Sequence, residues 1–118
     1  MQVVRAVIFH SRARDEIRAL PKELRYRLGR ALMALQLGYP LGMPVSRPMS
    51  MIAVGVDELR LREPDGNYRV FYYRKHPKGI LVLRAFRKKT EQTPQSEILL
   101  TRRRLKEMLD GGSQGDRR

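Results

Sequence analysis

The sequence predicts an α+β fold: a small, mainly antiparallel sheet with an N-terminal helical hairpin and a C-terminal helix. An apolar, β-branched segment opens the chain, an apolar stripe with helical spacing follows, and three strand-like segments precede a last amphipathic helix. This β-α-α-β-β-β-α order predicts helices packed on one face of the sheet. The length of 118 residues is that of one domain, expected over residues 1–109. Residues 110–118 are small and polar, which predicts a disordered tail.

The first half of the chain carries one strand signal and two helix signals. Residues 3–9 are apolar and largely β-branched, which predicts a strand. Ser11 is expected to cap a short helix that ends near residue 19, and Pro21 suits the first position of a second helix. Two helices joined so closely are expected to form an antiparallel hairpin. In the second helix, apolar side chains recur at helical spacing at Leu24, Leu28, Ala31 and Leu35.

The second half begins with a loop at residues 38–49, where glycine and proline interrupt regular structure. A hairpin is predicted around Gly66, because glycine adopts a positive φ without steric cost. Thr93 is expected to cap a last helix, with Pro94 in its first turn, that ends near residue 109. The three strands between loop and helix are predicted at residues 58–62, 68–74 and 79–86.

The composition is strongly basic. Lys and Arg number 25 against 12 Asp and Glu, which gives a net charge of +13, and 19 of the 25 are arginine. Such a charge favours a polyanionic partner: nucleic acid, a ribosome, an acidic protein or anionic lipid. An arginine-rich genome acting on an ordinary surface is the alternative. The chain has no cysteine, which excludes disulfides, thiolate nucleophiles and cysteine zinc sites. No apolar run approaches a membrane span or signal peptide, so a cytoplasmic protein without a membrane partner is expected.

The predicted hairpin sorts its side chains onto two faces. A two-residue loop places Arg62 opposite Arg69, whereas a four-residue loop places Arg60 opposite Arg69. Either register gives one apolar face and one face that mixes arginines with aromatic rings, and only an odd-length loop would break this pattern. The apolar face holds Leu59, Leu61, Tyr68, Val70 and Tyr72, and the basic face holds Arg60, Arg62, Arg69, Phe71 and Tyr73.

A second basic cluster follows the next strand. Arg87, Lys88 and Lys89 are consecutive, and Arg84 precedes them by three positions. Bases stack on aromatic rings while guanidinium groups bind phosphates, so the combination suits flexible RNA. The alternatives are that Phe71 and Tyr73 form a second core layer and that the charge run is simply solvated.

The possible chemistry is restricted by what the chain lacks. The carboxylates are scattered along the chain, and the adjacent Asp57 and Glu58 are expected on opposite faces of a strand. His10 and His76 lie far apart in the sequence. Neither a metal site nor a cofactor is therefore predicted. Metal-free RNA cleavage stays open, because RNA supplies its own 2′-hydroxyl nucleophile. Arginines can stabilise the phosphorane, but Lys88 or Lys89 could move protons only if neighbouring charge lowered its pKa. Such an enzyme would need a host such as the ribosome to position the RNA.

Several ordered motifs give the chain a family resemblance. They are FHSRARDEIRAL from Phe9, PVSRPM from Pro44, GVDELRLR from Gly55, YRVFYY from Tyr68, and AFRKKT from Ala85 followed by Thr93 and Pro94. Over residues 3–109 the chain resembles the phage-derived, HigB-type branch of the RelE/ParE toxin superfamily. This resemblance implies a RelE-like fold and the toxin of a type II toxin–antitoxin pair.

The resemblance also implies roles for individual residues. Toxins of the RelE group cut mRNA in the ribosomal A site with basic residues of the sheet. Arg69 matches the arginine of their Tyr-Arg-hydrophobic strand, Arg60 approximately matches a lysine of the preceding strand, and the cluster at Lys88 matches a terminal basic cluster. The tyrosine that RelE carries shortly afterwards has no counterpart at residues 91–95, so Lys88 is the candidate for that vacant role. The candidate catalytic residues are therefore Arg60, Arg69 and Lys88, and the candidate RNA- or ribosome-binding residues are Arg62, Tyr73, Arg84, Arg87 and Lys89.

The same resemblance implies partners and rival activities. The expected partners are the ribosome with its mRNA and a helix-turn-helix antitoxin, with operator DNA contacted only through that antitoxin. The antitoxin is expected to place carboxylates over Arg60, Arg62 and Arg69, or to block ribosome entry from the side. ParE relatives poison DNA gyrase on the same fold, so a gyrase poison is one alternative and a non-catalytic basic nucleic-acid-binding module is another.

Overall fold

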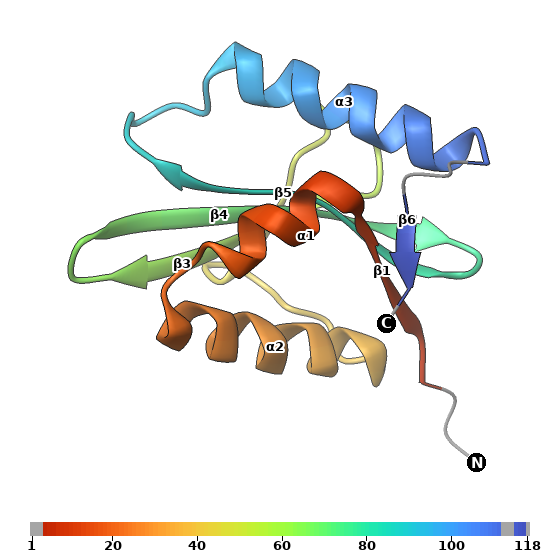
Figure 1. The fold of residues 1–118 in the computed structure, drawn as a ribbon, viewed down its shortest axis with the longest axis horizontal. Helices are drawn as coiled ribbons and strands as arrows, with labels where there is room; N and C mark the ends of the chain where they lie inside the picture. The colour runs from red at the N-terminus through yellow and green to blue at the C-terminus, as the bar shows by residue number, and fades with distance from the viewer. Residues whose placement is uncertain (1–3, 112–114, 118) are drawn as a thin grey trace.

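The computed structural model describes residues 4–111 and 115–117. Three helices and six strands follow one another along the described chain (Figure 1). They are β1 (Ala6–His10), α1 (Ser11–Arg18), α2 (Lys22–Gln36), β2 (Ser46–Pro48), β3 (Val56–Glu63), β4 (Gly66–His76), β5 (Gly79–Lys88), α3 (Gln95–Leu109) and β6 (Gly115–Arg117). The predicted α+β fold is confirmed.

The strands form one sheet in the order β2-β3-β4-β5-β1-β6. Only the pairing of β1 with β5 is parallel, so the sheet is mainly antiparallel as predicted. At this junction Gly79 faces Ala6, and a Cβ on Gly79 would lie 2.3 Å from the carbonyl oxygen of Ala6. Any side chain at this position would therefore force the N-terminal strand away from β5.

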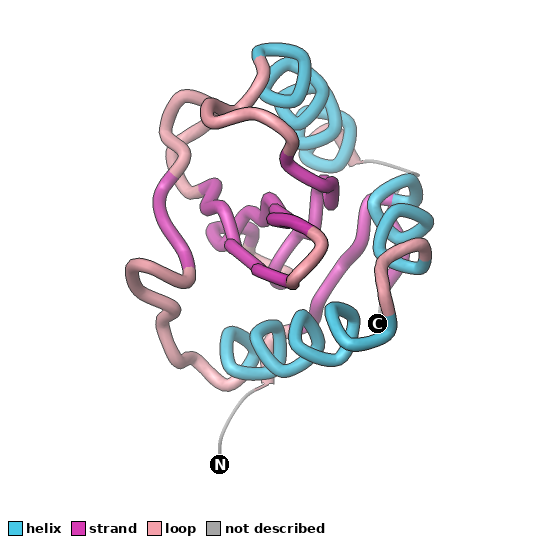
Figure 2. The backbone as a smooth tube through the Cα atoms, turned by 90° about the vertical axis from the view of Figure 1, so that its left-hand side faces the viewer, coloured by secondary structure: helices cyan, strands magenta, loops and turns pink. Residues whose placement is uncertain are grey.

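Helices cover both faces of the sheet, whereas the sequence predicted them on one (Figure 2). Helices α1 and α2 pack on the face that presents Leu59, Val70 and Tyr72. Helix α3 packs on the opposite face, against Phe71 and Leu83. The physical reason is that β4 and β5 are apolar on both sides, so each side needs a cover. Phe71 accordingly belongs to the core and is fully buried.

Local details differ from the predictions at three places. Strand β2 lies within the segment expected to be a loop. The side chain of His10, not Ser11, caps α1 by accepting a hydrogen bond from the backbone N–H of Arg12. Pro94 occupies the cap position of α3, where no side-chain cap bond forms, so Thr93 is not the cap.

The C-terminal segment also differs from the disordered tail that was expected. The backbone of β6 pairs with β1 in antiparallel fashion, which adds a sixth strand to the sheet. The predicted tail therefore holds a strand at residues 115–117, because the free edge of β1 offers unpaired backbone groups. Residues 112–114 and 118 lie outside the described part of the chain.

Candidate active site

The register of the β3–β4 hairpin brings the basic side chains together. Arg60 lies opposite Arg69, which is the second of the two registers considered from the sequence. The four-residue loop expected with this register is wrong, because Glu63 pairs with Gly66 and only Pro64 and Asp65 connect the strands. Two residues closer to the turn, Asn67 pairs with both Arg62 and Lys88 across three adjacent strands. The candidate site therefore lies at the hairpin end of the sheet.

A buried carboxylate organises this end of the sheet. Glu58 is only 1% exposed, and its Oε1 lies 3.2 Å from Nε of Arg47, 3.5 Å from Nε of Arg69 and 3.8 Å from Nε of Arg60. Its other oxygen, Oε2, is buried without a hydrogen-bond partner. One negative charge thus faces three positive ones. This cluster keeps a positive excess that an anion can satisfy.

The sequence reasoning missed both Glu58 and Arg47. The signal for Glu58 was its spacing, because it precedes Arg60 by two positions and alternate residues of a strand share a face. Arg47 could not be found in this way, because it lies in β2. The prolines of this segment had predicted a loop there, not a strand.

Arg69 is the most deeply placed of the candidate catalytic residues. It is 6% exposed, and its Nη1 donates a hydrogen bond to the carbonyl oxygen of Tyr68. Its Nε makes no hydrogen bond, although it faces Glu58. Burial lowers the pKa of Arg69, and the neighbouring Arg60 adds to this effect. A buried guanidinium with unused hydrogen-bonding capacity is suited to a phosphate ligand.

A groove of about 320 Å³ gives access to this arginine. Four arginines from three elements, α2, β3 and β4, line it, and the segment before β2 forms the remaining wall. Its lining consists of Arg27, Pro44, Val45, Arg60, Leu61, Arg62, Asn67 and Arg69. Arg27 of α2 was not predicted for the site; it reaches the hairpin by donating to the carbonyl oxygen of Arg62.

Lys88 is the last residue of β5, and its surroundings lower its affinity for a proton. Burial lowers the pKa of Lys88, and the positive charge of Arg69 lowers it further. Its Nζ also donates a hydrogen bond to the carbonyl oxygen of Glu91. The condition set from the sequence, that neighbouring cations should lower a lysine pKa, holds for this residue.

The other candidate binding residues do not all join the site. Arg62 lines the groove, and Lys89 lies exposed just after β5. Arg87 pairs with Tyr68 and therefore lies on the α1–α2 face, where it donates to the carbonyl oxygen of Asp65. Tyr73 is partly buried against the core under α3, which matches the core alternative.

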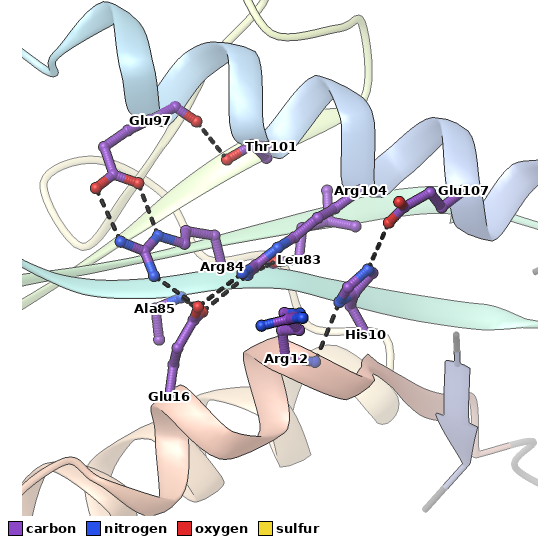
Figure 3. Close-up of polar contacts among 10 residues, drawn as sticks. All are labelled: His10, Arg12, Glu16, Leu83, Arg84, Ala85, Glu97, Thr101, Arg104 and Glu107. Carbon is purple, nitrogen blue, oxygen red and sulfur yellow. Dashed lines mark hydrogen bonds and ion pairs between the residues drawn. The ribbon is translucent and has the colours of Figure 1, made fainter. Parts of the chain in front are cut away.

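Arg84 belongs to a polar network between α1, β5 and α3, shown in Figure 3. It forms a bidentate pair with Glu97, at 2.7 and 2.9 Å, and its Nη1 lies 2.6 Å from Oε2 of Glu16. Arg104 binds the same Glu16 carboxylate through both terminal nitrogens. Two carboxylates thus neutralise Arg84 and hold it between the helices. Arg84 also lines a hollow of about 440 Å³ together with Arg87 and Lys89, apart from the groove at Arg69.

Across residues 4–111, no three His, Asp or Glu side chains converge as a metal site would require. Within the same stretch no helix is long and apolar enough to cross a membrane.

The sequence of the chain matches a known protein family. The family described as "Phage derived protein Gp49-like (DUF891)" matches residues 15–106, which include every residue of the cluster around Glu58. The chain belongs to this family. Gp49-like proteins are a toxin-like family of toxin–antitoxin systems. No curated protein matches the chain.

Proposed function

We propose that this Gp49-like chain is a toxin that cuts mRNA on the ribosome and thereby stops translation. The observation that carries the proposal is the cluster of Arg47, Arg60 and Arg69 around Glu58, with the buried Arg69 opening onto the groove. Such a cluster binds a phosphate and stabilises the extra charge of a phosphorane. A helix-turn-helix antitoxin is the proposed restraining partner, which fits the association of the family with toxin–antitoxin systems.

In the proposed reaction, the 2′-hydroxyl of the RNA attacks the adjacent phosphorus and the bond to the 5′ oxygen breaks. The products are a 2′,3′-cyclic phosphate and a free 5′-hydroxyl. Arg69 and Arg60 stabilise the pentacoordinate anion, and Lys88, with its lowered pKa, takes the proton of the 2′-hydroxyl. The departing oxygen takes its proton from water. A ribosome contributes the positioning of the RNA that this small site lacks.

The decisive experiment compares mRNA cleavage with and without ribosomes. We expect primer extension in a purified translation system to show cuts at codon-phased positions, and naked mRNA to stay intact at the same protein concentration. Equal cleavage of naked RNA would contradict ribosome dependence. Intact mRNA together with trapped gyrase–DNA complexes would replace the proposal by a gyrase poison.

The role of Lys88 is tested by a substitution that keeps its charge. Lys88→Arg introduces a group whose pKa lies above about 12, so it cannot accept a proton near neutral pH. We expect single-turnover cleavage on the ribosome to fall about 10²-fold while the affinity for ribosomes stays close to that of the parent chain. The parent rate should rise with pH toward the lowered lysine pKa, and the variant should lose this rise. A variant that retained both rate and pH profile would remove Lys88 from the proton transfer.

A further inference from the structure

Helix α2 presents an unpartnered surface on its outer side. A groove of about 480 Å³ runs along one flank, between α2, α1 and β1, and a second of about 540 Å³ runs along the other flank. The first has apolar side chains such as Phe9 and Ile17 in its lining. The second is bordered by Tyr26, Met33 and Tyr39, and each of these is more than half exposed. Exposed apolar side chains that gather in this way mark an interaction site.

The charges around the two grooves indicate what kind of partner fits. Arg18 and Arg25 line the first groove, Arg25 and Arg30 line the second, and neither lining contains an aspartate or glutamate. A second copy of the chain would bring the same cations and be repelled. RNA would meet mainly apolar walls. An apolar ridge flanked by carboxylates is complementary to both features.

Gly29 lies between the grooves and lines both of them. Glycine in the middle of a helix is unfavourable relative to alanine. Nothing in the described chain explains it, because a Cβ built on Gly29 would have no atom within 4 Å. A site without a side chain lets a second helix approach closely, and the crossing helix then sets its side chains into the grooves on either side.

We propose that α2 is the docking site for an amphipathic helix with acidic flanks, supplied by the antitoxin and crossing α2 at Gly29. The inference rests on the proposed function, from which the partner is taken. It locates that partner on the side of the sheet that α1 and α2 cover. The bound antitoxin then leaves the Arg69 groove uncovered and acts by its bulk, which prevents entry into the ribosome.

The charge requirement is tested with the purified product of the reading frame adjacent to the gene for this chain. Arg25→Glu is expected to weaken the complex about tenfold or more, mainly through a slower, less salt-dependent association. Lys22→Glu is the matched control, because it makes the same charge change on α2 outside both linings and should alter the dissociation constant less than about threefold. Equal losses in the two variants would mean that only total charge matters and would overturn the site.

The close approach is tested with Gly29→Leu. Since the surroundings of Gly29 are open, the free variant should fold with an unchanged or higher melting temperature and stay toxic. Its complex with the neighbouring protein should weaken about tenfold or more, so that co-expression no longer rescues growth. If co-expression of the neighbouring protein rescued growth equally well with the parent chain and with Gly29→Leu, the docking site would be refuted while the proposed function stood. A parent chain that neither binds the neighbouring protein nor is rescued by it would end the antitoxin partnership and this inference with it; the ribosome assay would decide the cleavage activity separately.

Discussion

The Arg69→Ala variant is expected to cleave ribosome-bound mRNA roughly 10²–10³-fold more slowly than the parent chain. Arg69 is the buried guanidinium that faces the groove, so its loss removes the charge closest to the developing phosphorane. The fold should survive, because Glu58 keeps Arg47 and Arg60 as counter-charges. Cleavage is measured by primer extension and growth arrest, and folding by circular dichroism.

Arg103→Ala provides the control for lost charge. Arg103 is an exposed residue of α3 and does not line the groove, so its removal lowers the net charge by the same amount outside the site. We expect cleavage within about twofold of the parent chain, since surface charges act weakly at a distance in salt. Comparable losses for both variants would show that Arg69 acts through bulk electrostatics. Full activity of Arg69→Ala would place the reaction elsewhere.

The largest expected effect on stability comes from Glu16→Ala. The Glu16 carboxylate accepts from both terminal nitrogens of Arg104, pairs with Arg84 and accepts from the backbone N–H of Ala85. Its removal leaves the buried Arg104 without its counter-charge and leaves Arg84 with Glu97 alone, which costs about 3 kcal/mol and lowers the melting temperature by roughly 10 °C. Thermal unfolding followed by circular dichroism measures the change.

An exposed ion pair at the C-terminal end of α3 serves as the comparison. Asp110→Ala breaks the pair between Lys106 and Asp110, whose side chains are both more than half exposed, and should change stability by less than about 0.5 kcal/mol. If Glu16→Ala were no more destabilising than Asp110→Ala, the network would contribute nothing beyond a surface pair.

The same residue makes stability depend on pH. Burial raises the pKa of Glu16, but the hydrogen bonds from Arg104 and Ala85 and the charges of Arg104 and Arg84 outweigh it and lower the pKa below 4.5. A pKa lower in the folded than in the unfolded state gives stability that is complete above 4.5 and is lost as the pH falls through the folded value. Glu16→Gln should therefore show a shallower loss of stability in acid than the parent chain.

The sequence was informative wherever a pattern was local. The alternation along the hairpin predicted that Arg60, Arg62 and Arg69 share a face, and the structure brings Arg60 opposite Arg69. Helical spacing found the buried Leu24, Leu28 and Leu35. These features depend only on the repeat of a strand or a helix.

Features that depend on distant segments could not be predicted in the same way. Arg84 was counted with the basic cluster because of its position in the chain. In the structure its guanidinium pairs with Glu16 of α1 and Glu97 of α3, which lie on either side of it. Arg47 reaches Glu58 only because a short strand forms in a segment rich in proline. No local repeat encodes either contact.

The parallel pairing of β1 with β5 has a consequence for how the protein is made. Ala6 leaves the ribosome early, but its partner Gly79 appears only after the helices and the β3–β4 hairpin have been synthesised. The sheet therefore cannot close until most of the chain is present, and such long-range pairing slows folding. Lys88 ends that same late strand. In a nascent chain the candidate site stays incomplete until β5 has been synthesised, so any step that needs Lys88 can begin only near the end of synthesis.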